Sequence, residues 1–135
     1  MYKNILIGVA LEHDGKIGGS LNVAQCLLAE GGKITALHVM EPISGYVEPY
    51  LPEGHHETRR HEAQAGLAAE LGGVKDVTPV VMSGNAGRVI VEFADDHDID
   101  CIIIASHQPG LQDYLLGSTA GRVVRHARCA VHVTR

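Results

Sequence analysis

Five short runs of apolar, mostly β-branched residues recur along the chain, separated by segments with helical spacing. The runs cover residues 4–11, 33–40, 77–83, 101–106 and 130–135. Continuous runs such as Ile102-Ile103-Ile104 are typical of strands covered on both faces. They predict a parallel sheet with helices on each side.

The intervening segments predict helices over residues 19–30, 55–71, 87–97 and 118–127. In the first, Gly31-Gly32 is expected to end the helix. In the third, one side carries an apolar group made of Val89, Ile90, Phe93 and Ala94. Alternating strands and helices in 135 residues predict one domain, residues 1–135, with an α/β fold. We expect a doubly wound, Rossmann-like sheet of five parallel strands, with ligands at its carboxyl edge.

Composition narrows the function classes. The chain has 16 acids against 11 Lys plus Arg and no Trp, which disfavours nucleic-acid binding. No apolar run approaches the roughly 18 residues of a membrane helix, and no signal-peptide pattern opens the chain, so we expect a cytoplasmic protein without membrane insertion. The three cysteines, Cys26, Cys101 and Cys129, lack metal or redox spacing and are expected to be reduced core residues.

The segment from Cys101 to Arg128 contains a candidate phosphate site. A strand is followed by a polar loop and then by Gly117-Ser118 at the start of a helix, whose free amides attract anions. From Ser118 to the C-terminus the chain has four arginines, two histidines and no acid, which adds a positive field. Because Ser is also a common N-cap without any ligand, an ordinary helix start remains the alternative.

Two other loops are candidates for binding. The turn at residues 83–87 joins a strand to a helix through glycines and is a second, weaker anion candidate. Residues 41–54 hold three of the five prolines and form either a surface excursion or a lid over a ligand.

Several catalytic patterns are missing. The chain has no phosphate-binding P-loop, no Gly-x-Gly-x-x-Gly and no Gly-x-Ser-x-Gly elbow, so no catalytic residue is expected. His55, His56 and His61 lack carboxylate or Cys partners at zinc spacing, and no metal site is expected. His38 and His132 lie within predicted strands and are expected to be core or edge histidines.

The C-terminal stretch IIIASHQPGLQDYLLGSTAGRVVRHARCAVHVTR resembles the universal stress protein family, and the likeness extends over essentially the whole chain. It is similar to the bacterial F/G-type subgroup in its ASH-x-P loop, YLLGS turn and VVRHA helix. The resemblance implies the Rossmann-like fold of the adenine nucleotide alpha hydrolase class, and ATP or AMP as ligand, with or without Mg²⁺. By the same resemblance, the nucleotide-binding residues are Gly8, Val9, Ala10, Val39, Ala105, Ser106, His107, Gly117, Ser118 and Thr119.

The chain departs from the family's glycine signature of Gly, two residues, Gly, nine residues, Gly-Ser/Thr. Ala105 and Gln108 stand at the first two glycine positions, and eight residues rather than nine precede Gly117-Ser118. Ala10 stands where nucleotide-binding members carry an Asp, for which Asp14 is a substitute.

The resemblance therefore implies an adenine-nucleotide-binding stress-response regulator, a sensor and not an enzyme. A nucleotide-free dimeric interaction module and slow ATP hydrolysis are the alternatives. The apolar strand at residues 130–135 predicts a homodimer formed through the C-terminal strand, or a dimer of dimers. An unidentified regulatory protein is the expected partner.

Overall fold

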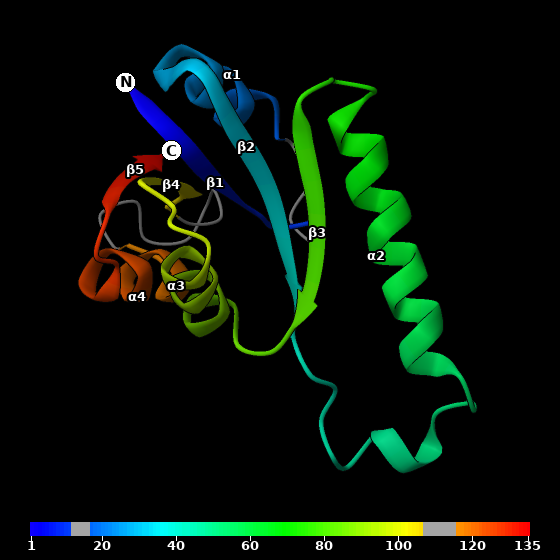
Figure 1. Cartoon of the computed structure of the whole chain (residues 1–135). Coiled ribbons are helices and arrows are strands. Elements are labelled where there is room, and N and C mark those ends of the chain that lie inside the picture. Colours follow the sequence, from blue (N-terminus) through cyan, green and yellow to red (C-terminus); the bar gives the residue numbers. More distant parts are fainter. Residues whose placement is uncertain (12–16, 107–115) are drawn as a thin grey trace.

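Strands and helices alternate along the chain in the computed structural model, which describes residues 1–11, 17–106 and 116–135 (Figure 1). The elements in chain order are β1 (Tyr2–Val9), α1 (Gly18–Leu27), β2 (Leu28–Met40), the 3-10 helix η1 (Glu48–Tyr50), α2 (His55–Leu71), β3 (Val77–Ser83), α3 (Ala86–Asp96), β4 (Cys101–Ala105), α4 (Ser118–His126) and β5 (Ala130–Thr134).

The five strands form one sheet in the order β3-β2-β1-β4-β5, and every neighbouring pair is parallel. This confirms the predicted doubly wound α/β fold. The order reverses between β1 and β4, and that switch point is where ligands collect in open sheets of this type.

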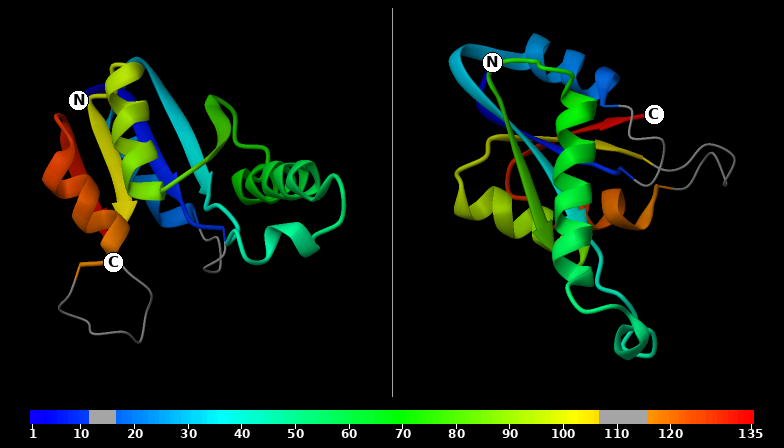
Figure 2. Two further views of the ribbon diagram at one scale, coloured as in Figure 1. Left: turned by 90° about the horizontal axis from the view of Figure 1, so that it is seen from below. Right: turned by 90° about the vertical axis from the view of Figure 1, so that its right-hand side faces the viewer.

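Helices cover both faces of the sheet (Figures 1 and 2). On one face, Leu21 of α1 and Leu67 of α2 pack against Ile5, Ile7 and Ile103 of the central strands. On the other face, α3 and α4 lie side by side over a second core. Its strand residues are Leu6, Leu37, Ile102 and Ile104, and its helix residues are Val89, Ile90, Phe93, Ala94 and Val123. The apolar side predicted for α3 is therefore confirmed.

The predicted end of the first helix is wrong. Helix α1 ends at Leu27, and Leu28 already has extended backbone, with φ −73° and ψ 129°. Leu28 pairs with Tyr2 of β1, whereas the continuous pairing begins only at Asn4 and Lys33. Gly31 has a φ of 76° and lies within this irregularity. Strand pairing thus replaces the last helical turn, a tertiary contact that local periodicity does not reveal.

The cysteines differ from one another more than the sequence predicted. Cys101 is buried in β4 and Cys129 is partly buried, but Cys26 lies on the exposed side of α1, so its prediction as a core residue is wrong. All three are free thiols. Within the described ranges, no helix has the length and apolar character needed to cross a membrane.

Candidate functional site

The end of β4 and the start of α4 are joined directly at the switch point. The amide of Ser106 donates to the carbonyl oxygen of Thr134 at 2.8 Å, which continues the pairing of β4 with β5. The amide of Gly117 donates to the carbonyl oxygen of Ser106 at 2.7 Å. The structure therefore brings Ser106 and Gly117 together, although ten residues separate them in the sequence.

Among the described residues, no side chain caps the first turn of α4. Gly117 is the N-cap residue, with φ −59° and ψ 158°, and the first turn holds no acidic residue. Arg125 and His126 lie in the last turn, where cations favour the helix dipole. An α-helix leaves its first amides without intrahelical partners. Because the Gly117 amide is already engaged, the amides from Ser118 onward are the groups that an anion would meet.

The predicted residues of β1 and β2 lie at the same carboxyl edge. His38 is only 5% exposed, and its Nδ1 donates to the carbonyl oxygen of Val9 at 2.9 Å, which links the two strand ends. This confirms His38 as a satisfied core histidine. Val39 is buried at 5% exposure, whereas Ala10 follows the end of β1 and is exposed.

Close packing of α3 on the sheet explains why position 8 is a glycine. A Cβ added at Gly8 would lie 3.3 Å from Cδ1 of Ile90 in α3 and 3.6 Å from Cδ1 of Ile104 in β4. The small residue thus lets α3 approach the sheet.

The loop half of the predicted site is only partly described. Ala105 is exposed at the end of β4 and pairs with Thr134. Ser118 is exposed and Thr119 is half-buried in the first turn of α4. His107, Gln108 and Asp14 lie outside the described residues.

The turn before α3, the second anion candidate, is filled by the chain's own groups. The side chain of Asn85 accepts a hydrogen bond from the amide of Arg88 at 3.1 Å, and Oε1 of Glu41 accepts one from the amide of Ala86 at 3.5 Å. Gly87 faces α4, because an added Cβ would lie 2.8 Å from Cδ of Arg122. This helix start is therefore closed by side chains, and its glycine serves helix packing.

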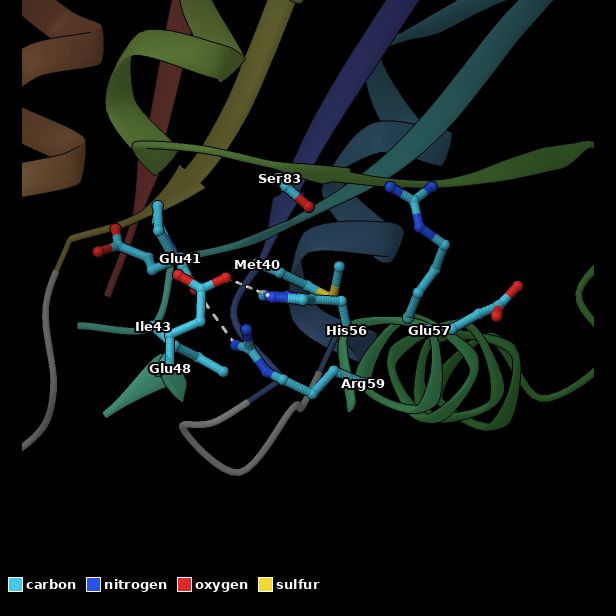
Figure 3. Close-up of a pocket in the computed structure, with 10 residues that line it drawn as sticks. Met40, Glu41, Ile43, Glu48, His56, Glu57, Arg59 and Ser83 are labelled. Carbon is cyan, nitrogen blue, oxygen red and sulfur yellow. Dashed lines mark hydrogen bonds and ion pairs between the residues drawn. The ribbon is translucent and has the colours of Figure 1, made fainter. Parts of the chain in front are cut away.

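Sequence reasoning missed a cavity of about 480 Å³ at the ends of β2 and β3 (Figure 3). Its wall combines the end of β2, the following loop, the first turns of α2 and the last residue of β3, and the lining residues are Met40, Glu41, Pro42, Ile43, Glu48, His56, Glu57, Arg59, Arg60 and Ser83. The proline-rich composition of residues 41–54 was the available signal. The loop is thus one wall of a cavity.

Two contacts fix this wall to α2. Nε2 of His56 lies 2.7 Å from Oε1 of Glu48, and Nη2 of Arg59 donates to the carbonyl oxygen of Glu41 at 3.2 Å (Figure 3). Acidic and basic side chains therefore both line the cavity.

Two cysteine thiols of the described residues have shifted pKa values. Burial raises the pKa of the Cys101 thiol to about 11, and burial also raises the pKa of Cys129, so both thiols stay protonated at neutral pH. In the described part of the chain, no three His, Cys, Asp or Glu side chains cluster as a metal site would require. Backbone amides at the positive end of a helix are suited to binding an anion.

Comparison with known proteins supports this architecture. The family model described as "Universal stress protein family" matches residues 1–135. Universal stress protein G of Salmonella typhimurium is 30% identical over 145 residues, and the match covers 100% of both chains.

Two solved structures have a similar fold. The hypothetical protein MJ0577 superimposes with a TM-score of 0.79 at 25% identity, covering 99% of this chain and 96% of that one. A universal stress protein solved in complex with cAMP superimposes with a TM-score of 0.61 at 19% identity, covering 99% and 97%. The doubly wound sheet, the Gly117-Ser118 helix start and the full-length family match lead to one conclusion: this chain belongs to the universal stress protein family.

Proposed function

We propose that the chain binds an adenine nucleotide, ATP or AMP, across the carboxyl ends of β1 and β4. The observation that carries this proposal is the start of α4, which has glycine as its N-cap and no acid in its first turn. It lies directly beside Ser106 at the switch point of the sheet. A relative with the same fold was solved with cAMP, which is an adenine nucleotide.

The phosphates belong at the helix start. The amides that follow Gly117, together with the hydroxyls of Ser118 and Thr119, would donate to phosphate oxygens. Mg²⁺, where present, would be held through the phosphates, since the described part of the chain has no cluster of metal ligands. Ala105 and Ser106 would complete this side, and the family resemblance adds His107, which lies outside the described residues.

The base belongs on the other side of the switch point, where the Val39 backbone would contact adenine. Gly8, Val9 and Ala10 lie behind it at the end of β1. Val39 directly precedes Met40, which lines the cavity of about 480 Å³. The ligand would therefore extend from the start of α4 toward that cavity.

The proposed role is that of a cytoplasmic regulator which senses nucleotide and passes the signal to a protein partner. Hydrolysis would require a positioned general base near neutral pKa, and none stands out among the described residues. We therefore expect phosphate release to be no faster than that of a variant that cannot bind nucleotide.

Calorimetric titration tests the proposal. The purified chain is first stripped of bound nucleotide, and any released nucleotide is identified by chromatography. Mg-ATP, Mg-free ATP and AMP are then titrated in turn, with GTP as the control for base recognition. Saturable heat with an adenine nucleotide supports the proposal. No heat at millimolar concentrations of all three adenine ligands overturns it.

A nucleotide-free dimeric module is the second candidate. Alanine at positions 10 and 105, in place of the family's Asp and Gly, favours it. Strand β5 pairs with β4 on one side only and ends the sheet order, and its Ala130 and His132 are exposed. Two such edges related by a two-fold axis would pair to give a homodimer, and stacking of these pairs would give a dimer of dimers. Light scattering on the nucleotide-stripped chain decides whether this dimer exists without ligand.

A further inference from the structure

The connection between β2 and α2, residues 41–54, has the most exposed aromatic side chains of the described chain. Tyr46 is 90% exposed, Tyr50 is 86% exposed and Val47 is 48% exposed. We call residues 41–54 the tyrosine loop. It contains three acids, namely Glu41, Glu48 and Glu53, and no Lys or Arg. Exposed Tyr side chains are typical of protein interaction surfaces, and here they lie among negative charges.

A surface of opposite charge lies on α4 and the turn that follows it. Arg122 and Arg125, which are three positions apart on α4, and Arg128 in the following turn are all exposed. We call these three residues the arginine face. No acid occurs from residue 116 to the C-terminus, so nothing in this stretch neutralises it.

The part of the tyrosine loop around η1 lies far from α4 in one molecule, whereas Glu41 at the start of the loop reaches Ala86, next to the Gly87 that packs on Arg122. The tyrosine loop follows β2 and leads into α2 beside β3, at one end of the strand order, whereas α4 lies beside β5 at the other end (Figures 1 and 2). In the left view of Figure 2, α3 and the sheet lie between η1 and α4. A contact of Tyr46 or Tyr50 with the arginine face must therefore join different copies of the chain.

We propose that the tyrosine loop of one copy docks on the arginine face of a second copy. Each of the two tyrosines offers about 150–250 Å² of surface that burial would remove from water. Arginine side chains stack on aromatic rings and pair with carboxylates, so the arginine face is complementary to both components of the loop. The β5 edge is not part of this contact, which adds a second interface to the chain.

Contacts with α2 hold the tyrosine loop in place. Nη2 of Arg59 in α2 donates to the carbonyl oxygen of Glu41, and His56 pairs with Glu48 at 2.7 Å. These contacts hold the two ends of the segment that presents Tyr46. Because part of the ordering is already supplied by the fold, docking costs less conformational entropy.

Sedimentation velocity of the full chain, across protein concentration and ionic strength, tests the contact. We expect a concentration-dependent association step that high salt weakens. The double substitution Tyr46→Ser/Tyr50→Ser should weaken that step about thirtyfold, as loss of a 2 kcal/mol anchor would. Both side chains are exposed, so folding should be unaffected. Glu62→Arg, a charge reversal on an exposed part of α2 outside the loop, is the matched control and should leave the step unchanged.

Charge exchange identifies the partner surface. Arg125→Glu and Glu53→Arg should each weaken the step by up to about fivefold, the range of exposed charge pairs. Their combination in one chain should restore at least half of the loss. Any association through β5 persists in all these variants, so its presence or absence does not affect the outcome. A wild-type chain without a salt-sensitive step, or an unchanged step in Tyr46→Ser/Tyr50→Ser, would overturn the proposal.

Discussion

Helices α3 and α4 begin in the same way and differ in what closes their first turn. Both follow a strand of the sheet at its carboxyl edge, and both have glycine in or beside the first turn. At α3, Asn85 accepts from the amide of Arg88 and Glu41 accepts from that of Ala86. At α4, the N-cap residue is a glycine, which has no side chain to cap the helix, and no acid lies in the first turn.

The difference separates a helix start that serves the fold from one that is open to a ligand. Side-chain caps offset the cost of unpaired amides and stabilise the protein without any ligand. An uncapped start leaves that stabilisation to water or to a bound anion. Changes at α3 should therefore affect stability, whereas changes at α4 should affect binding.

Gly117→Val gives the largest expected effect. A φ of −59° suits any residue, so the backbone does not require glycine, and the free energy of unfolding should fall by no more than about 1 kcal/mol. The added side chain would stand at the helix start and keep phosphate from the amides. Two lost charge-assisted hydrogen bonds correspond to a loss of at least about 100-fold in nucleotide affinity, which calorimetry would measure.

Gly121→Val is the matched control for this prediction. It lies one turn further along α4, where an added Cβ would meet only ordinary contacts at 3.8 Å and 3.9 Å. Nucleotide affinity should stay within twofold of the wild type. Equal affinity losses in both variants would mean that the α4 start has no special role.

Gly87→Val tests the contact between the two helices. Its Cβ would lie 2.8 Å from Cδ and 3.0 Å from Cβ of Arg122, so α3 and α4 must move apart. Overpacking of this kind costs about 2 kcal/mol, which urea unfolding would detect. Gly18→Val is the control, because nothing lies within 4 Å of a Cβ there. Similar stabilities for the two variants would argue against close packing of α3 on α4.

The sequence predicted the sheet because its strands are apolar enough to be recognised alone. Ile102, Ile103 and Ile104 lie in a strand buried on both faces, and residues 55–71 form the predicted helix without shift. The end of α1 was predicted wrongly for the opposite reason. Leu28 leaves the helix to pair with Tyr2, a contact between residues 26 positions apart that no local pattern contains.

The sequence predicted the site only where its residues are neighbours in the chain. Gly117-Ser118 marks a helix start in any reading of the sequence, and the structure places it beside Ser106. The closure at α3 was not predictable, because Glu41 reaches it from the end of another strand. The cavity has the same origin, since four separate segments build its wall.

Asn85→Ala should reduce stability by about 1 kcal/mol, the usual cost of losing an N-cap side chain. Nucleotide affinity should not change, because Asn85 caps α3 and not α4. Asn85→Ser retains an acceptor oxygen and should recover most of the loss. Thermal unfolding and calorimetry on the same samples separate the two effects. A fall in affinity without a fall in stability would reverse the roles assigned to the two helix starts.

Glu41→Gln gives the smallest effect and isolates the charge at the start of α3. The 3.5 Å contact with the Ala86 amide is long and exposed, and Gln retains an acceptor at the same place. Only the attraction between the carboxylate and the positive helix end is removed, worth about 0.3 kcal/mol. Salt screens such interactions, so the variant and the wild type should differ in urea unfolding at low ionic strength and coincide near 1 M salt. A difference that persists in high salt would contradict this, because it would mean that the Gln side chain does not keep the contact with the Ala86 amide and that screened charge does not explain the effect.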